Sequence, residues 1–213
     1  PFLEHISVEQ GLSQSSVYCI LQDKQGFLWF GTGDGLNKYD GYEIITYRHH
    51  QSDTNSLSDN TIRTLMEDKD GNLWIGTADG LNSYNPRNGK YSFYQLGNSE
   101  ALLQDTKGRI WAGGSGGLWF RYSVRNIFHQ FQYPSEHKKT NEHRSVKALF
   151  EDHSGNIWIG TIDGIEMIDR SGEFHCNWNN IEEKINTKLN VSSFAEANDG
   201  NLWIATYGGV LLQ

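Results

Sequence analysis

One phrase recurs along the chain, and it constrains the fold more than any other feature. The sequence DKQGFLWFGTGDGLNKYD at 23–40 returns almost unchanged as DKDGNLWIGTADGLNSYN at 68–85. Five copies are centred on tryptophans at spacings of 45, 37, 47 and 45 residues: Trp29, Trp74, Trp111, Trp158 and Trp203. A repeat of this length is typical of folds assembled from one supersecondary unit used several times.

Each position of the repeat has a structural explanation. An aspartate six residues before the tryptophan and a glycine three before it form a tight-turn signature, in which the carboxylate accepts backbone N–H groups and the glycine takes a positive φ. The fifth copy has Ala197 in place of the aspartate. A small residue two positions after the tryptophan would let a neighbouring sheet come close: Gly31, Gly76, Gly113, Gly160 and Ala205.

The hydrophobic spacing in each copy is two, which predicts strands. First strands are expected at 16–23, 61–68 and 145–152, and fourth strands at 42–49, 91–96 and 127–133. Between them lie the tryptophan strand, an Asp-Gly hairpin turn and a third strand. The only helix expected is at 181–189. The sequence therefore predicts an all-β protein, a β-propeller built from four-stranded antiparallel blades.

The chain is expected to form a single propeller domain, or a propeller fragment, over 1–213. The fifth copy supplies only three strands, and residues 2–8 read as an orphan strand. We expect residues 1–8 to provide the outer strand of a closing blade, which would remove an exposed edge. The same pattern also fits a propeller whose remaining blades lie outside the sequence.

Composition excludes some functions. The formal net charge of −8 argues against general affinity for DNA or anionic membranes, because phosphate binding needs clustered basic residues. There is no apolar run long enough to span a bilayer and no visible signal peptide, and the chain reads as a mature fragment. Cys19 and Cys176 occupy non-equivalent places in their repeats, so we expect two separate thiols.

The wording of the repeat resembles the two-component regulator propeller repeat. The residues that carry the resemblance are GLSQSSV (11–17), QDKQGFLWFGTGDGLNKYDG (22–41), and the copies EDKDGNLWIGTADGLNSYN (67–85) and EDHSGNIWIGTIDGI (151–165). The resemblance implies a seven-bladed propeller from the periplasmic sensor region of a Bacteroides-type hybrid two-component system. Such regions sense breakdown products of complex glycans and are followed by kinase, receiver and DNA-binding modules.

The resemblance therefore implies a non-catalytic sensor fragment without cofactors. Its expected partners are an oligosaccharide, the downstream modules of the same polypeptide, and a second copy in a homodimer. The histidine kinase activity and transcription regulation would belong to those other modules, and direct nucleic acid contact is not expected.

Residues repeated in every blade are needed for architecture, so binding residues should lie where the blades differ. The loops between second and third strands share one face with the connections between blades. Carboxylates, amides, an arginine and an aromatic ring there suit a sugar. The predicted ligand-binding residues are Asp34, Asn60, Asp79, Arg144, Asp163 and Tyr207.

Two other classes of function stay open. A propeller glycosidase or lyase would need opposed carboxylates, and the aspartate of DKQGFLW lies one position too early for a sialidase Asp-box. A pure interaction or dimerisation scaffold needs no pocket at all. We predict neither catalytic residues nor a metal site, because the histidine pairs His49-His50, His137 with His143, and His175-Cys176 lack convincing ligand spacing.

Overall fold

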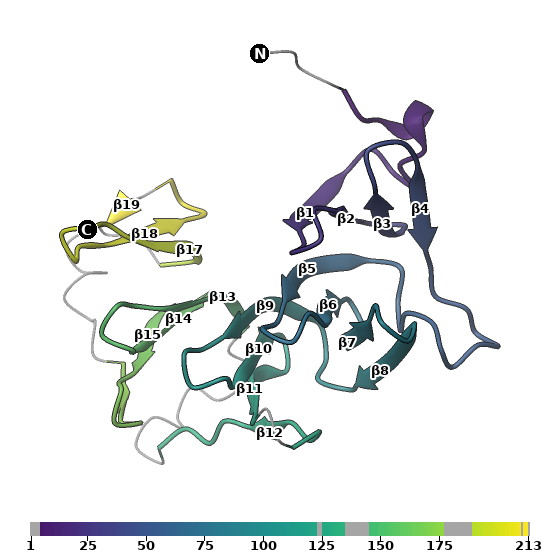
Figure 1. Cartoon of the computed structure of the whole chain (residues 1–213). Helices are drawn as coiled ribbons and strands as arrows, with labels where there is room; N and C mark the ends of the chain where they lie inside the picture. Colours follow the sequence, from purple (N-terminus) through teal and green to yellow (C-terminus); the bar gives the residue numbers. More distant parts are fainter. Residues whose placement is uncertain (1–4, 123–124, 135–144, 177–188, 210, 213) are drawn as a thin grey trace. The chain divides into compact units, whose positions relative to one another are not determined.

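A computed structural model describes residues 5–122, 125–134, 145–176, 189–209 and 211–212 (Figure 1). The chain divides into two compact units, Pro1–Ser99 and Glu100–Gln213. Within the described ranges the secondary structure is β-strand apart from one short 3-10 helix, η1 (Val8–Gln10). No described helix has the length and apolar character needed to cross a membrane.

The first unit contains two four-stranded antiparallel sheets, each a simple meander. The first sheet has the order β1-β2-β3-β4, with β1 Val17–Gln22, β2 Leu28–Thr32, β3 Gly35–Tyr39 and β4 Ile44–Tyr47. The second has the order β5-β6-β7-β8, with β5 Ile62–Glu67, β6 Leu73–Thr77, β7 Gly80–Asn85 and β8 Lys90–Tyr94.

The second unit contains the other three sheets, of which the first begins at the last residue of the preceding unit. That sheet comprises β9 Ser99–Gln104, β10 Ile110–Gly114, β11 Gly117–Arg121 and β12 His129–Gln130. Next come β13 Val146–Glu151, β14 Ile157–Thr161, β15 Gly164–Ile168 and β16 Phe174–His175. The last sheet has three described strands, β17 Val191–Glu196, β18 Leu202–Thr206 and β19 Leu211–Leu212.

The predicted all-β, four-stranded blades are confirmed, and most predicted strands agree with the structure within two residues. The outer strands are the least regular, since β12 and β16 each have only two residues. The predicted N-terminal strand stays untested: residues 2–4 lie outside the described residues, and Ser7 already caps η1. The predicted helix at 181–189 also lies almost wholly outside the described part of the chain.

The core lies between neighbouring sheets, which is why the tryptophan strand is apolar on both faces. In the first unit Trp29 and Leu36 pack against Ile62, Leu73 and Ile75 of the next sheet. In the second unit an equivalent cluster joins Trp111 and Leu118 to Val146, Ile157 and Ile159. A strand covered on both faces reads as apolar on both, and neighbouring sheets supply this cover here.

The first strand of four sheets has a β-bulge, and in three of them it accompanies a branched side chain that packs on the preceding sheet. Pairing shifts between Val17 and Cys19, and equivalent shifts occur at Ile62/Thr64, Val146/Ala148 and Val191/Ser193. Beyond the bulge, Ile62 lies over Gly31, where an added Cβ would come within 2.7 Å of its Cγ2. Val191 lies over Gly160 in the same way, at 2.5 Å from its Cγ1. The predicted close-packing role of the small residue is therefore observed, while the bulge was not foreseen.

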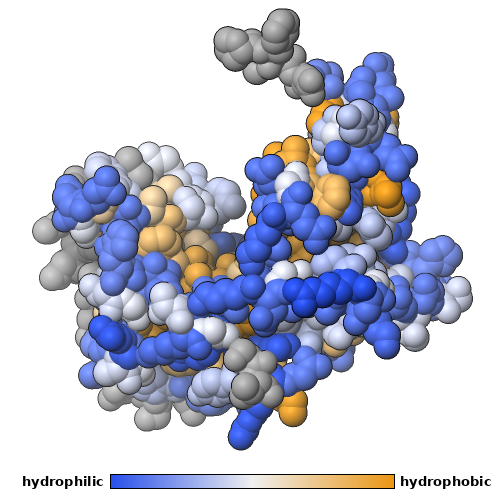
Figure 2. All heavy atoms as spheres, in the orientation of Figure 1, coloured by the Kyte–Doolittle hydropathy of each residue, from blue (hydrophilic) through white to orange (hydrophobic). Residues whose placement is uncertain are grey.

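The first sheet leaves part of its outward surface uncovered. Ile20 is 64% exposed, whereas Leu65 at the same place in the next sheet is partly buried. Figure 2 shows orange, hydrophobic surface on this sheet, and Val8 and Ile45 are also exposed apolar side chains.

Candidate functional site

The repeated aspartate is fully used by its own turn. In the second sheet Asp68 Oδ1 accepts the backbone N–H groups of Asp70 at 3.0 Å and Asn72 at 2.8 Å. Its other oxygen, Oδ2, accepts the indole N–H of Trp74 at 2.8 Å. Asp68 is only 5% exposed, so these donors stand in for water. The carboxylate therefore ties the turn to the buried tryptophan.

The same aspartate–tryptophan bond occurs in three other sheets. The indole N–H donates to Asp23 at 2.8 Å, to Asp105 at 2.9 Å and to Asp152 at 2.8 Å in the respective copies. In the fifth copy, which has Ala197, Asp199 instead accepts two hydrogen bonds from Asn201. The constant six-residue spacing between the aspartate and the tryptophan was the sequence signal for this bond. Our sequence reasoning did not use that signal.

Hydrogen bonds at such turns predict a loss of stability in acid. Burial raises the pKa of Asp152, but hydrogen bonds from Trp158 and Asn156 outweigh it and hold the pKa below its ordinary value. A group with a depressed folded pKa contributes stability above its unfolded pKa of about 3.9 and loses it as pH falls through the folded pKa. We expect the melting temperature to drop progressively below about pH 4. Calorimetry between pH 7 and 2.5 checks this, and Asp152→Asn should show a shallower drop; a flat profile would contradict it.

The turns between second and third strands lie beside the connections between sheets, as predicted. Backbone hydrogen bonds join Gly35 N to Asn60 O at 2.7 Å, Ala78 N to Thr61 O at 3.1 Å and Tyr207 N to Asn190 O at 2.9 Å. In the first two copies a buried asparagine reinforces the contact: Asn37 accepts the N–H of Ser13, and Asn82 accepts that of Ser58. In each unit separately, we call the end of the strands at which these turns and connections lie the turn face.

Two of the predicted ligand-binding residues lie close together on the turn face. The carboxylate of Asp34 accepts two hydrogen bonds from the guanidinium of Arg48, the shorter at 2.9 Å, and both side chains are 45% exposed. Asn60 accepts the backbone N–H of His49 at 2.7 Å. The sequence reasoning missed Arg48 and His49, although both follow the fourth strand directly, where a connection must begin.

The remaining predicted residues are distributed over other copies. Asp79 is exposed in the β6–β7 turn, and Asp163 is exposed in the β14–β15 turn. Tyr207 is 72% exposed after β18, which fits the expected exposed aromatic ring. Arg144 lies outside the described residues.

A cavity of about 850 Å³ lies at the other end of the strands in the second unit, among the aspartate turns. Phe150, Phe194, Lys107 and Arg170 contribute to its wall. Much of its polar lining has a structural role, because glutamates link neighbouring sheets there. Glu151 accepts the backbone N–H of Thr106 at 2.7 Å and its hydroxyl at 2.6 Å.

A second glutamate in the same unit forms such a link to a histidine. Glu196 accepts the backbone N–H of His153 at 2.7 Å and pairs with its imidazole Nδ1 at 2.9 Å. In the first unit Glu67 accepts the backbone N–H of Lys24 at 2.8 Å, so this link is a repeated device of the fold.

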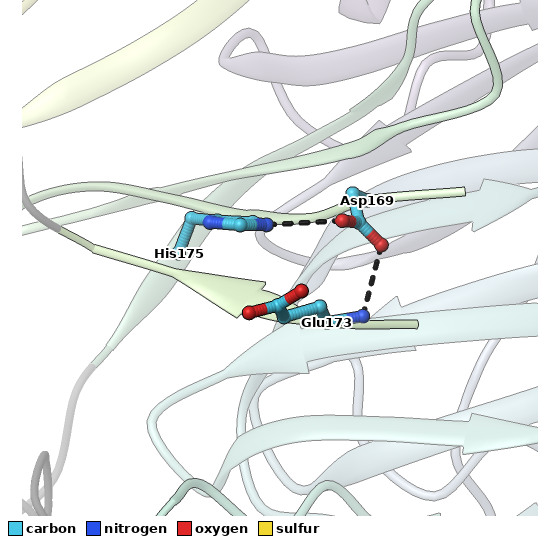
Figure 3. Close-up of side chains that lie close together, drawn as sticks. All are labelled: Asp169, Glu173 and His175. Atoms are coloured by element: carbon cyan, nitrogen blue, oxygen red, sulfur yellow. Dashed lines mark hydrogen bonds and ion pairs between the residues drawn. The ribbon is translucent and has the colours of Figure 1, made fainter. Parts of the chain in front are cut away.

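Three side chains of the β15–β16 hairpin have donor atoms within 4.8 Å of one another: Asp169, Glu173 and His175 (Figure 3). We call this group the hairpin triad. His175 Nε2 lies 3.0 Å from Asp169 Oδ2, and the side chain of His175 is 39% exposed. Sequence reasoning considered His175 only with Cys176 and therefore missed the triad.

The two cysteines are not joined by a disulfide, as expected. Cys19 packs against Gly31, and burial raises the pKa of its thiol to about 12. A thiol with so high a pKa stays protonated and unreactive at neutral pH.

The stacked four-stranded meanders and their repeated aspartate–tryptophan turns define a β-propeller repeat protein. Four segments match the model of the two-component regulator propeller: residues 11–34, 56–79, 142–163 and 186–208. These four segments carry the two-component regulator propeller repeat.

Comparison with known proteins agrees with that assignment. A stretch of 44 residues is 59% identical to Histidine kinase P4 of Formosa agariphila, and it covers 21% of this chain and 3% of that protein. One similar solved structure is the extracellular domain of a hybrid two-component system of B. thetaiotaomicron, with a TM-score of 0.75 and 24% identity. The match covers 100% of this chain and 32% of that domain. A virginiamycin B lyase from Staphylococcus aureus matches with a TM-score of 0.69 and 13% identity, over 95% of this chain and 70% of the lyase.

Both solved structures are less than 25% identical to this chain. The similarity therefore concerns the fold alone, which is a propeller. The chain spans about a third of the bacterial extracellular domain that it matches and a small fraction of the curated kinase.

Proposed function

We propose that this chain is a non-catalytic, ligand-sensing part of the periplasmic sensor region of a hybrid two-component receptor. The two-component regulator propeller repeats support this function most directly. The similarity to a histidine kinase over 44 residues and to an extracellular domain of a hybrid two-component system supports the same context. The kinase and transcription-regulating modules would then belong to other parts of the same polypeptide.

We propose that the ligand is an oligosaccharide and that it binds on the turn face. One observation carries this proposal: backbone hydrogen bonds hold hairpin turns beside connections, and both kinds of loop carry polar side chains that differ from blade to blade. On the turn face of the first unit, Asp34, Arg48 and Asn60 offer acceptors and donors for sugar hydroxyls. On the turn face of the second unit, Tyr207 offers an exposed ring for a sugar C–H face.

The residues that we propose as ligand-binding are therefore Asp34, Asn60 and Asp79 in the first unit, to which we add Arg48, and Arg144, Asp163 and Tyr207 in the second unit. No catalytic role is proposed for the aspartates, because each lies in a hairpin turn that the architecture repeats. The backbone N–H groups of Asp34 and Asp163, for example, each donate to the hydroxyl of the threonine two residues earlier, at 3.1 Å. A signal would pass to the downstream modules through a change in domain or homodimer packing, since a propeller blade is stiff.

A binding screen of the chain against oligosaccharides, with product analysis of each mixture, tests the proposal. We expect binding by calorimetry without any cleavage product. Arg48→Ala should weaken binding to the turn face of the first unit about tenfold, and Tyr207→Ala binding to that of the second unit, as loss of one polar or aromatic contact of about 1.4 kcal/mol would do. Asp199→Ala, on the opposite end of the strands, is the matched control and should bind normally. Product release would favour a glycosidase or lyase, and absence of binding to any oligosaccharide would contradict the sensor proposal.

A further inference from the structure

The hairpin triad combines donor atoms of the kinds that bind transition metals. Asp169 directly follows β15, Glu173 directly precedes β16, and His175 lies two residues after Glu173 within β16. Residues two apart on a strand point to the same side. Figure 3 shows the imidazole of His175 directed at the carboxylate of Asp169, with Glu173 projecting beside them. One imidazole nitrogen and two carboxylates are therefore collected at one point.

The orientation of Asp169 is fixed by its own turn. Its Oδ1 accepts the backbone N–H of Ser171 at 2.9 Å, the hydroxyl of Ser171 at 2.6 Å and the backbone N–H of Glu173 at 2.9 Å. The second oxygen, Oδ2, is left directed at His175. A ligand oriented in this way by neighbouring donors is typical of metal sites.

The turn itself does not need a histidine at this place. In the first sheet Asp40 makes the same kind of turn, accepting the N–H groups of Tyr42 at 2.8 Å and Glu43 at 2.9 Å. The residue two positions after Glu43 is Ile45, where the β15–β16 hairpin has His175. The imidazole is thus a feature of one blade and is not part of the repeated architecture.

We propose that Asp169, Glu173 and His175 form a binding site for a divalent transition metal of the Zn²⁺ class. The ligand set of one nitrogen and two oxygens suits Zn²⁺, at ligand distances of about 2.0–2.2 Å. Tetrahedral ligands at that distance lie about 3.3 Å apart, close to the 3.0 Å between Asp169 Oδ2 and His175 Nε2. Binding requires rotation of the Glu173 carboxylate toward the other two groups and leaves a fourth position for water.

Calorimetric titration of the full 213-residue chain with ZnCl₂ tests the site. We expect one Zn²⁺ per chain, and only weak binding of Ca²⁺, which prefers an all-oxygen shell. His175→Ala and Glu173→Gln should each weaken Zn²⁺ binding by about tenfold or more, because even indirect partners of metal ligands are worth that much. Asp169→Asn is unsuitable, since Asp169 Oδ1 also holds the turn.

His153→Ala is the matched control, because His153 is likewise an exposed histidine paired with a carboxylate, that of Glu196, and no third ligand accompanies them within the described part of the chain. Its Zn²⁺ affinity should equal that of the unchanged chain. A second readout is the visible absorption of bound Co²⁺, which should disappear in His175→Ala while the metal-free melting temperature stays the same. No Zn²⁺ binding, or binding that survives both His175→Ala and Glu173→Gln, would overturn the proposal.

Discussion

Asp68→Ala is expected to lower the free energy of unfolding by about 3 kcal/mol, one of the two largest effects that we predict. The substitution removes the acceptor for the backbone N–H groups of Asp70 and Asn72 and for the buried indole N–H of Trp74. A buried donor left without a partner costs about 1–3 kcal/mol, and Trp74 is only 2% exposed, so water cannot replace the carboxylate there. Urea unfolding followed by tryptophan fluorescence measures the change.

Asp199→Ala is the matched control for Asp68→Ala. Asp199 is an exposed aspartate of the fifth turn, and Asn201 is its one hydrogen-bond donor among the residues that the structure describes. Its loss should change the free energy of unfolding by less than about 1 kcal/mol. Equal effects of the two substitutions would show that the bond to tryptophan contributes little.

Gly76→Ala is expected to destabilise the chain by about 1–3 kcal/mol through overpacking. A Cβ at this position would lie 2.6 Å from the backbone carbonyl oxygen of Ser99 and 2.5 Å from Cγ2 of Thr64. A backbone atom cannot move aside without shifting its strand, so the contact cannot be relieved cheaply. The fall in melting temperature and in the free energy of unfolding are the measurements.

Gly33→Ala gives the comparison for Gly76→Ala. A Cβ at Gly33 would also be crowded, at 2.5 Å, but by the end of the flexible Gln14 side chain. The backbone conformation of neither glycine falls in the left-handed region, so both substitutions test packing alone. Gly33→Ala should cost clearly less, and the reverse order would contradict the packing argument.

The sequence alone was sufficient to predict the strands and turns of each blade. Its two-residue hydrophobic spacing, the Asp-x-x-Gly turns and the small residue after each tryptophan all act over a few neighbouring residues, where steric and hydrogen-bonding rules are strong. These features predicted the sheets, the turns and the close approach at Gly31 and Gly160, and the wording of the repeat indicated the family.

The tertiary structure decided what local rules cannot reach. The β-bulge that aims Ile62 and Val191 at the preceding sheet depends on pairing between strands. The pairing of Asp34 with Arg48, the glutamate links between sheets and the hairpin triad join side chains whose meeting depends on strand register and on sheet stacking. A shift of one residue in strand register would turn every side chain to the other face, and local sequence rules do not set that register.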